Sequence, residues 1–200
     1  MPLQKARNRV PTKPAPRGFK APLTVSHQAL LAGGDDHRFR AVVYLMVLGF
    51  GRMLACRDAF GRALQLTPNQ YAVLIGVAHT QGQSGVGVRA LAEHVLLAAT
   101  HVTTDVGRLA RRGLLAKRVN PTDRRAVLVS LTREGEAAIE TIAPLLRATN
   151  DTLFQGVDAE GFIALERFLH RFADQSAKAV EALRTRIDTS RPATGNLPPD

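Results

Sequence analysis

Side chains that can form hydrogen bonds recur on one side of residues 99–111, at a spacing that fits a helix. At about 100° per residue, Val102, Val106 and Leu109 fall on one face. The opposite face carries small hydroxyls and guanidinium groups, which can bond to base edges and phosphate oxygens. We therefore expect a helix that packs through its apolar face and meets a groove with its polar face. The polar residues are Thr100, Thr103, Thr104, Arg108 and Arg111, with His101 at the edge.

A second group of charges lies at a predicted turn. Residues 114–119 and 126–131 each read as a strand, the second with alternating apolar side chains. The intervening letters NPTD form a turn sequence, which makes the two strands a hairpin. Charges at a hairpin tip indicate solubility as readily as binding. Beside the polar helix, they favour a ribbon that reaches DNA backbone or the minor groove. The tip residues are Asp123, Arg124 and Arg125.

Both groups belong to one order of elements within residues 88–132: two short helices, a strand, a basic turn and a second strand. That order is typical of a winged helix-turn-helix. Gly113 follows Arg111 and Arg112, as expected of a residue in the left-handed conformation that ends a helix. The two cations also suit the negative end of the helix dipole.

Two helices are predicted before this region. The first is strongly apolar, begins at Asp35 or Asp36 and runs to about Leu64. A T-x-x-Q capping box at Thr67, with proline at the first helical position, then starts a helix that continues to about His79. A glycine-rich segment ends that helix and leads into the helix-turn-helix.

Two long helices follow Thr132. The first has an apolar stripe that Pro144 interrupts, and proline should kink it, because it lacks an amide proton and crowds a carbonyl of the preceding turn. The second begins at Asp158, and its apolar face runs from Phe162 to Ile187. These stripes are too long to be covered by the small winged region. We therefore expect them, together with the first helix, to pair with a second copy of the chain about a two-fold axis.

Four segments resemble the successive motifs of the MarR family of bacterial transcription regulators. They read LTPNQYAVL at 66–74, RALAEHV at 89–95, RLARRGLLAKR at 108–118 and NPTDRRAVLVSLTREG at 120–135. The resemblance covers roughly residues 35–188, and its most specific part is the Asp-x-Arg turn followed by V-x-L-T-x-x-G. Two residues depart from the family pattern. Ala98 stands where a serine often caps the recognition helix, and Asp105 stands where an apolar residue is usual.

The resemblance implies a homodimer that places one recognition helix per subunit in successive major grooves of a pseudo-palindromic operator on double-stranded DNA. It also implies that Asp123 orients Arg125, which enters the minor groove, and we expect Arg124 to contact phosphate. The expected DNA-binding residues are Thr100, His101, Thr103, Thr104, Arg108, Asp123, Arg124 and Arg125.

The resemblance further implies a small effector, commonly an aromatic acid, a phenolic compound or a thioester of one. It would bind between the dimerisation helices and the DNA-binding lobe, against aromatic and sulfur side chains of the first two helices. An arginine would pair with its carboxylate. Such residues at helical spacing more often form a core than a ligand site. The candidates are Tyr44, Phe50, Arg52, Met53, Arg57, Tyr71 and His79.

The charge of the chain agrees with a polyanionic partner. The formal net charge of +10 favours nucleic acid, although an anionic membrane surface would attract the same charge. The longest uncharged apolar run, Ala41 to Gly51, is far short of the roughly 20 residues that span a bilayer, and no signal-peptide core follows the basic N-terminus. We therefore expect a cytoplasmic protein with no membrane partner.

Composition divides the chain into three parts. Residues 1–34 are basic and proline-rich without an acidic residue, which predicts a flexible arm. This arm would either keep the chain soluble or follow DNA phosphates or cover the partner subunit. Residues 35–188 read as one domain, in which 35–64 and 133–188 are dimerisation helices and 67–132 are the DNA-binding lobe. Residues 189–200 read as a flexible tail.

Other kinds of chemistry have little support. The single cysteine, Cys56, excludes an intrachain disulfide and a cysteine zinc cluster, and the six histidines show no ligand spacing. We expect no metal and no cofactor beyond the effector. Nucleophile elbows, phosphate-binding loops and paired catalytic carboxylates are missing, which argues against an enzyme.

The sequence thus predicts a mainly α fold with a small β-wing and long N- and C-terminal dimerisation helices. The predicted function is a ligand-responsive transcription regulator, specifically a repressor. Two alternatives stay open. One is an architectural DNA-binding protein without sequence preference, and the other is a redox-sensing regulator that acts through Cys56.

Overall fold

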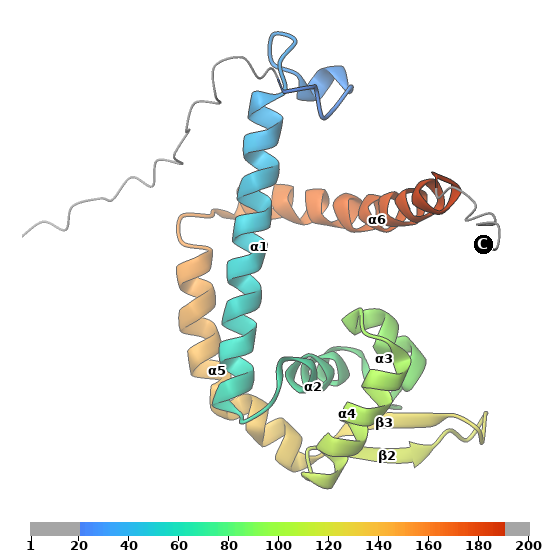
Figure 1. The fold of residues 1–200 in the computed structure, drawn as a ribbon. Coiled ribbons are helices and arrows are strands. Elements are labelled where there is room, and N and C mark those ends of the chain that lie inside the picture. Colours follow the sequence, from blue (N-terminus) through green and yellow to red (C-terminus); the bar gives the residue numbers. More distant parts are fainter. Residues whose placement is uncertain (1–20, 191–200) are drawn as a thin grey trace, which may run out of the picture. The chain divides into compact units, whose positions relative to one another are not determined.

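The computed structural model describes residues 21–190 (Figure 1). It is mainly helical with one small antiparallel sheet, which confirms the predicted fold class. Residues 1–20 of the predicted arm and residues 191–200 of the predicted tail lie outside this range. The elements in chain order are η1 (Gln28–Leu30), α1 (His37–Ala63), α2 (Pro68–Thr80), β1 (Val86–Gly87), α3 (Val88–Val95), α4 (Ala99–Arg111), β2 (Leu115–Val119), β3 (Val127–Leu131), α5 (Arg133–Leu153) and α6 (Ala159–Ser190).

The chain divides into two compact units, the first ending at Glu136 and the second beginning at Ala137. The first unit holds α1 and the winged helix-turn-helix. In it, α2, α3 and α4 pack against one another, and α4 also packs against β2 (Figure 1). Their apolar side chains form the core, since a helix with one apolar stripe must bury it against a neighbour. Fully buried members are Val73, Leu74, Val77, Leu91, Val102, Leu109 and Val129.

The predicted cap of α2 is confirmed. The Thr67 hydroxyl accepts a hydrogen bond from the Gln70 amide at 3.3 Å, and the Gln70 side chain accepts one from the Thr67 amide at 3.2 Å. This reciprocal pair satisfies two amides that the first helical turn would leave unpaired.

The wing is a three-stranded sheet in the order β1-β3-β2. The predicted hairpin is confirmed, with Val119 opposite Val127 and Leu115 opposite Leu131. Strand β1 was missed, because only two residues, inside a glycine-rich segment, pair with β3. Gly85, just before β1, has φ +77°, and a Cβ atom there would lie 3.0 Å from the Val129 carbonyl oxygen. A glycine suits this position because it tolerates both the conformation and the close approach.

The segment before α1 is anchored by Asp36, whose carboxylate is buried. Asp36 Oδ2 accepts hydrogen bonds from the Thr24 amide at 2.6 Å and the Thr24 hydroxyl at 2.7 Å. Asp36 Oδ1 forms an ion pair with Arg40 at 3.0 Å. The hydroxyl of Thr24, its amide and the Arg40 charge hold the pKa of Asp36 below its ordinary value. The part of the predicted arm from residue 21 onward therefore has a defined attachment, which the sequence reading did not foresee.

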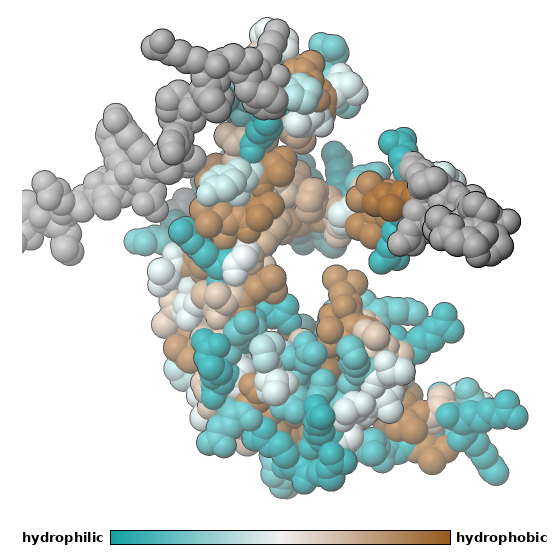
Figure 2. Space-filling model, viewed as in Figure 1, coloured by the Kyte–Doolittle hydropathy of each residue, from teal (hydrophilic) through white to brown (hydrophobic). Residues whose placement is uncertain are grey.

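Helix α1 is buried in the first unit only near its C-terminal end, at Phe60 and Gly61. Figure 2 shows apolar surface gathered over α1 and hydrophilic surface over much of the helix-turn-helix. Among residues 21–190, α1 is the one helix long and apolar enough to cross a membrane by length and composition. Those two properties are shared by helices that pair with another subunit, so they do not identify a membrane span.

The second unit consists of α5 from Ala137 onward and α6. Helix α5 continues through Pro144, where the sequence predicts a kink. Beyond its end, the Phe154 ring meets the Phe162 ring edge-on, with ring centroids 6.1 Å apart. Asp158 Oδ1 accepts a hydrogen bond from the Gly161 amide at 2.8 Å, which caps α6. Much of the apolar face of α6 is exposed, at Phe162, Phe168, Phe172, Val180, Leu183 and Ile187.

Candidate nucleic-acid interface and effector pocket

Helix α4 has the two faces that the sequence predicts. Val102, Val106 and Leu109 are buried, whereas the candidates on the polar face are exposed. The hydroxyls of Thr103 and Thr104 donate to carbonyls one turn back on the helix, at 2.8 Å and 3.0 Å. Each hydroxyl oxygen keeps acceptor capacity on its outer side. The exposed candidates are Thr100, His101, Thr103, Thr104 and Arg108.

The two departures from the family pattern have visible consequences on α4. Ala98 is the N-cap residue of α4, and its side chain cannot accept a hydrogen bond. The first amides of α4 therefore have no partner in the side chain of the N-cap residue. Asp105 is buried, and its Oδ1 lies 3.3 Å from Nη1 of Arg108. The carboxylate that replaces an apolar residue therefore has a charged partner on the exposed side of the helix.

The turn of the wing is held by short-range hydrogen bonds to two side chains, those of Asn120 and Asp123. Asn120 Oδ1 accepts from the Thr122 amide at 3.0 Å and from its hydroxyl at 2.8 Å. Asp123 Oδ1 accepts from the backbone amide of Arg125 at 3.0 Å. Asp123 thus fixes the backbone from which the Arg125 side chain leaves, and both Arg124 and Arg125 are exposed. On β2, Arg118 donates to the Ser84 carbonyl.

The sequence reading missed a contact made by Arg112. It places Arg111 and Arg112 together as cations at the end of α4. In the structure, Arg112 reaches the residues that follow α1 and donates to two carbonyl oxygens, those of Gln65 at 2.8 Å and Leu64 at 3.2 Å. No local sequence pattern predicts this contact, because the two partners are 47 and 48 residues away from Arg112 along the chain.

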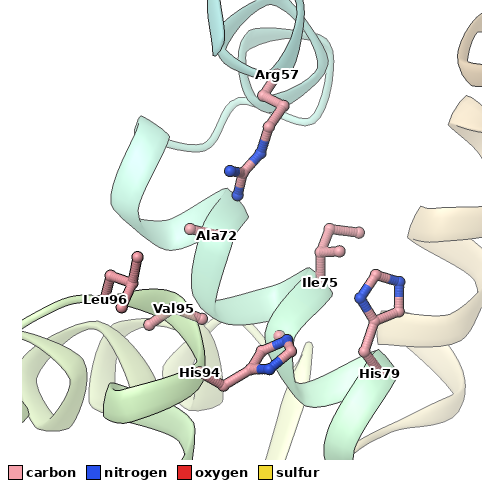
Figure 3. Close-up of a pocket in the computed structure, with 8 residues that line it drawn as sticks. Arg57, Ala72, Ile75, His79, His94, Val95 and Leu96 are labelled. Atoms are coloured by element: carbon pink, nitrogen blue, oxygen red, sulfur yellow. The ribbon is translucent and has the colours of Figure 1, made fainter. Parts of the chain in front are cut away.

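A hollow of about 320 Å³ lies between α1, α2 and α3. Arg57 extends from α1 toward α2, His79 stands on α2, and His94 stands on α3 (Figure 3). The His79 and His94 rings meet edge-on with centroids 6.4 Å apart. Within residues 21–190, Arg57 forms no ion pair with a carboxylate, so its guanidinium can take an external anion. The remaining lining residues are Ala72, Ile75, Gly76, Val95 and Leu96.

This hollow brings together two of the seven predicted effector residues, Arg57 and His79, and adds His94, which the sequence reading missed. Tyr71 is buried in the core, where its ring lies 6.2 Å from that of Phe60. Burial raises the pKa of the Tyr71 hydroxyl, and the nearby Arg57 charge opposes that shift. Tyr44, by contrast, lines a separate hollow near the start of α1. The other three candidates, Phe50, Arg52 and Met53, are exposed along α1.

Two further sequence-based expectations concern thiol and metal chemistry. Cys56, the residue of the redox alternative, lies half-buried on α1. In the described part of the chain, histidine, cysteine and acidic side chains do not gather into a group of three or more that could hold a metal ion.

The packed helix-turn-helix, the exposed polar face of α4 and the arginine-tipped wing define the winged helix-turn-helix class of DNA-binding proteins. Residues 64–126 match the family model described as the MarR family. Among solved structures, BpsR of Bordetella bronchiseptica, whose DNA binding is regulated by 6-hydroxynicotinic acid, is 26% identical with a TM-score of 0.54. That match covers 66% of this chain and 98% of the BpsR chain.

Two curated proteins are similar in sequence. The transcriptional activatory protein BadR of Rhodopseudomonas palustris is 33% identical over 84 residues, which cover 42% of this chain and 48% of BadR. The HTH-type transcriptional regulator MhqR of Bacillus subtilis is 28% identical over 95 residues, which cover 48% of this chain and 63% of MhqR. This chain therefore spans about half of the one and under two thirds of the other.

Residues 64–126 therefore resemble the MarR family, and both similar curated proteins are transcription regulators. Members of this family bind DNA as dimers and are in general not enzymes.

Proposed function

We propose that this protein is a homodimeric, sequence-specific repressor that binds a pseudo-palindromic operator and is released by a small aromatic acid. The observation that carries the DNA-binding part is the division of α4 into a buried apolar face and an exposed face of hydroxyls and arginine. The exposed arginines of the wing lie next to it in sequence and share its lobe. One recognition helix per subunit would enter the major groove, and Arg125 would enter the adjacent minor groove. Such a protein would act in the cytoplasm.

Footprinting on DNA from upstream of the protein's own gene tests this proposal. The expected result is one protected region containing two half-sites related by a two-fold axis and separated by about one helical turn, roughly 10 base pairs. Protection spread evenly along the fragment would instead support the architectural alternative. A reporter gene under the same promoter then shows whether the protein represses or activates transcription. This question matters because BadR is named as an activatory protein. Higher expression without the protein supports repression, and lower expression contradicts it.

The effector would occupy the hollow that Arg57, His79 and His94 line. Its volume of about 320 Å³ lies at the lower end of the range for small-molecule sites, roughly 300–1,000 Å³. An aryl carboxylate has the two features that this lining complements: an anionic group for Arg57 and a flat apolar ring for Ile75 and Val95. The regulation of BpsR by 6-hydroxynicotinic acid supports this class of effector.

Release of DNA would be a shift between two arrangements of the dimer. An effector that prefers the non-binding arrangement by about 3 kcal/mol would lower operator affinity roughly 100-fold, and operator DNA must weaken effector binding by the same factor. Titration of 6-hydroxynicotinic acid and related aryl carboxylates, with and without operator, measures both effects. Equal affinity in the two conditions rules out the compound as the effector.

Arg57→Ala and Arg52→Ala form a matched pair for locating the effector. Both remove one arginine from α1, but only Arg57 lines the hollow. Arg57→Ala should weaken effector binding about tenfold or more, since a charge-assisted hydrogen bond is lost, while Arg52→Ala should leave it unchanged. The reverse result would move the site to the exposed part of α1.

The redox alternative is tested with Cys56→Ser. If the thiol has no sensing role, this variant should release the operator in response to oxidants to the same extent as the wild type.

A further inference from the structure

Helix α1 ends in a compact hydrogen-bonded cap. The Leu66 amide donates to the Gly61 carbonyl at 2.8 Å, and the Gln65 amide donates to the Arg62 carbonyl at 2.9 Å. Gln65 has φ +55°, the left-handed conformation that this type of cap requires. The cap satisfies two of the last carbonyls of α1. The carbonyls of Leu64 and Gln65, at the negative end of the helix dipole, need partners from elsewhere.

Helix α4 ends in a cap of the same type. The Leu114 amide donates to the Leu109 carbonyl at 3.0 Å, and the Gly113 amide donates to the Ala110 carbonyl at 3.0 Å. Gly113 supplies the left-handed residue, with φ +75°. Arg112 immediately precedes it as the C-cap residue, so the point at which its side chain leaves α4 is fixed by the cap.

Arg112 joins the two caps. Its Nη1 donates to the Gln65 carbonyl oxygen at 2.8 Å, and its Nη2 donates to the Leu64 carbonyl oxygen at 3.2 Å. A guanidinium is planar and always charged, so two donors of one fork on two adjacent carbonyls hold both direction and distance. The end of the recognition helix is thereby tied to the end of α1.

The opposite side of the α4 cap is tied to the beginning of α5. The Thr132 hydroxyl donates to the Gly113 carbonyl at 2.5 Å and accepts from the Gly135 amide at 3.0 Å, while the Thr132 amide donates to the Leu114 carbonyl at 3.2 Å. A Cβ atom at Gly135 would lie 2.2 Å from the Leu114 carbonyl oxygen, so the contact leaves no room for a side chain. The recognition helix is thus held at one end between α1 and the first turn of α5.

We propose that Arg112 is a positioning residue that sets the direction of α4 relative to α1. In a dimer paired through α1, this direction determines the separation of the two recognition helices, and so whether both fit the operator at once. The inference rests on the proposed operator-binding function. A positioning role differs from a DNA contact because the Arg112 guanidinium binds protein carbonyls. Loss of the Arg112 side chain should therefore weaken operator binding without removing a phosphate contact.

Operator affinity measured at several salt concentrations separates these roles. Arg112→Ala should weaken operator binding about tenfold while the slope of log affinity against log salt stays that of the wild type. Arg38→Ala is the matched control, because it removes the same charge from an exposed residue near the start of α1, away from the helix-turn-helix in sequence. Arg112→Lys keeps the charge but cannot form the fork, and should give an intermediate loss of about threefold. Unchanged affinity for Arg112→Ala, or a slope shallower by about 0.9, would overturn the positioning role.

Hydrogen exchange of the free protein tests, without DNA, whether the contact of Arg112 with the Leu64 and Gln65 carbonyls restrains the end of α1. In Arg112→Ala, the amides of residues 64–66 should exchange faster than in the wild type and in Arg38→Ala, because the α1 cap loses its hydrogen bonds to α4. Equal exchange in all three proteins would mean that the tie does not restrain α1 in solution, and would overturn the proposal. If the wild type showed no operator preference, the operator-binding function would fail, while the exchange result would still decide whether the two helices are coupled.

Discussion

Asp105 and Arg108 form an ion pair one helical turn apart on α4, with Oδ1 and Nη1 separated by 3.3 Å. The Asp105 side chain is 7% exposed and that of Arg108 is 54% exposed, so the pair spans from the core of the lobe to its surface. A carboxylate is costly to bury without a partner, and Arg108 provides one. The same contact restrains the arginine that we expect to reach DNA.

Arg108→Ala should lower operator affinity by about 1 to 3 kcal/mol and relax the base preference at the position that Arg108 contacts. The measurement is a fluorescence-anisotropy titration with the operator and with single-base variants of it. Arg38→Ala is the control for net charge, because Arg38 is exposed near the start of α1, away from the helix-turn-helix in sequence. Equal losses in both variants would show that charge, and not a specific contact, accounts for the effect.

Arg125→Ala should lower operator affinity by about 1 to 3 kcal/mol without destabilising the fold, since its side chain lies on an exposed turn. Asp123→Ala gives a sharper test. Removing an acidic residue should strengthen DNA binding if charge alone matters. Because Asp123 holds the Arg125 amide at 3.0 Å, we expect weaker binding instead. Unchanged affinity of Arg125→Ala at two salt concentrations would remove the wing arginine from the interface.

Leu169→Glu should convert the dimer into monomer or aggregate. Leu169 lines an apolar hollow on α6 with Phe154 and Phe162, on a helix whose apolar face is largely exposed in a single chain. A carboxylate on this face would be buried without a partner in the dimer. Light scattering measures the mass, and Lys178→Glu, at an exposed position of the same helix, is the control. A monodisperse dimer of wild-type stability would exclude this part of α6 from the interface.

Leu91→Ala and Leu96→Ala should differ strongly in stability, although both shorten a leucine of the helix-turn-helix. Leu91 is 0% exposed in the core, so its truncation should cost about 2 to 5 kcal/mol. Leu96 is 89% exposed and has φ +56°, so its truncation should change the free energy of unfolding by less than about 0.5 kcal/mol. Urea denaturation compares the two. Similar losses would mean that Leu96 is covered in solution.

Much of the fold could be predicted from local sequence signals. The capping box at Thr67, the glycine at 113 and the alternation in residues 127–131 each act over a few positions, and the structure confirms the element that each one indicates. Strand β1 could not be found this way, because two residues are too short for a periodic pattern and it exists only by pairing with β3.

The candidate sites also differ in whether local sequence signals or long-range packing determine them. Helical periodicity was enough to place Thr100, Thr103 and Arg108 on an exposed face. The effector hollow depends on which helices meet, so periodicity placed Arg57 and His79 on the right elements but could not add His94 from α3 or exclude the buried Tyr71. The contact of Arg112 could not be predicted for the same reason, because its partners, Leu64 and Gln65, lie just beyond the end of α1.

The most direct test of the central claim is competition between the protein's own upstream DNA and random DNA of equal length at physiological salt. A sequence-specific regulator should prefer the upstream fragment by at least about 1,000-fold, and Arg108→Ala together with Arg125→Ala should remove most of that preference. Equal affinity for both DNAs, with a steep salt dependence, would contradict the claim and indicate an architectural DNA-binding protein.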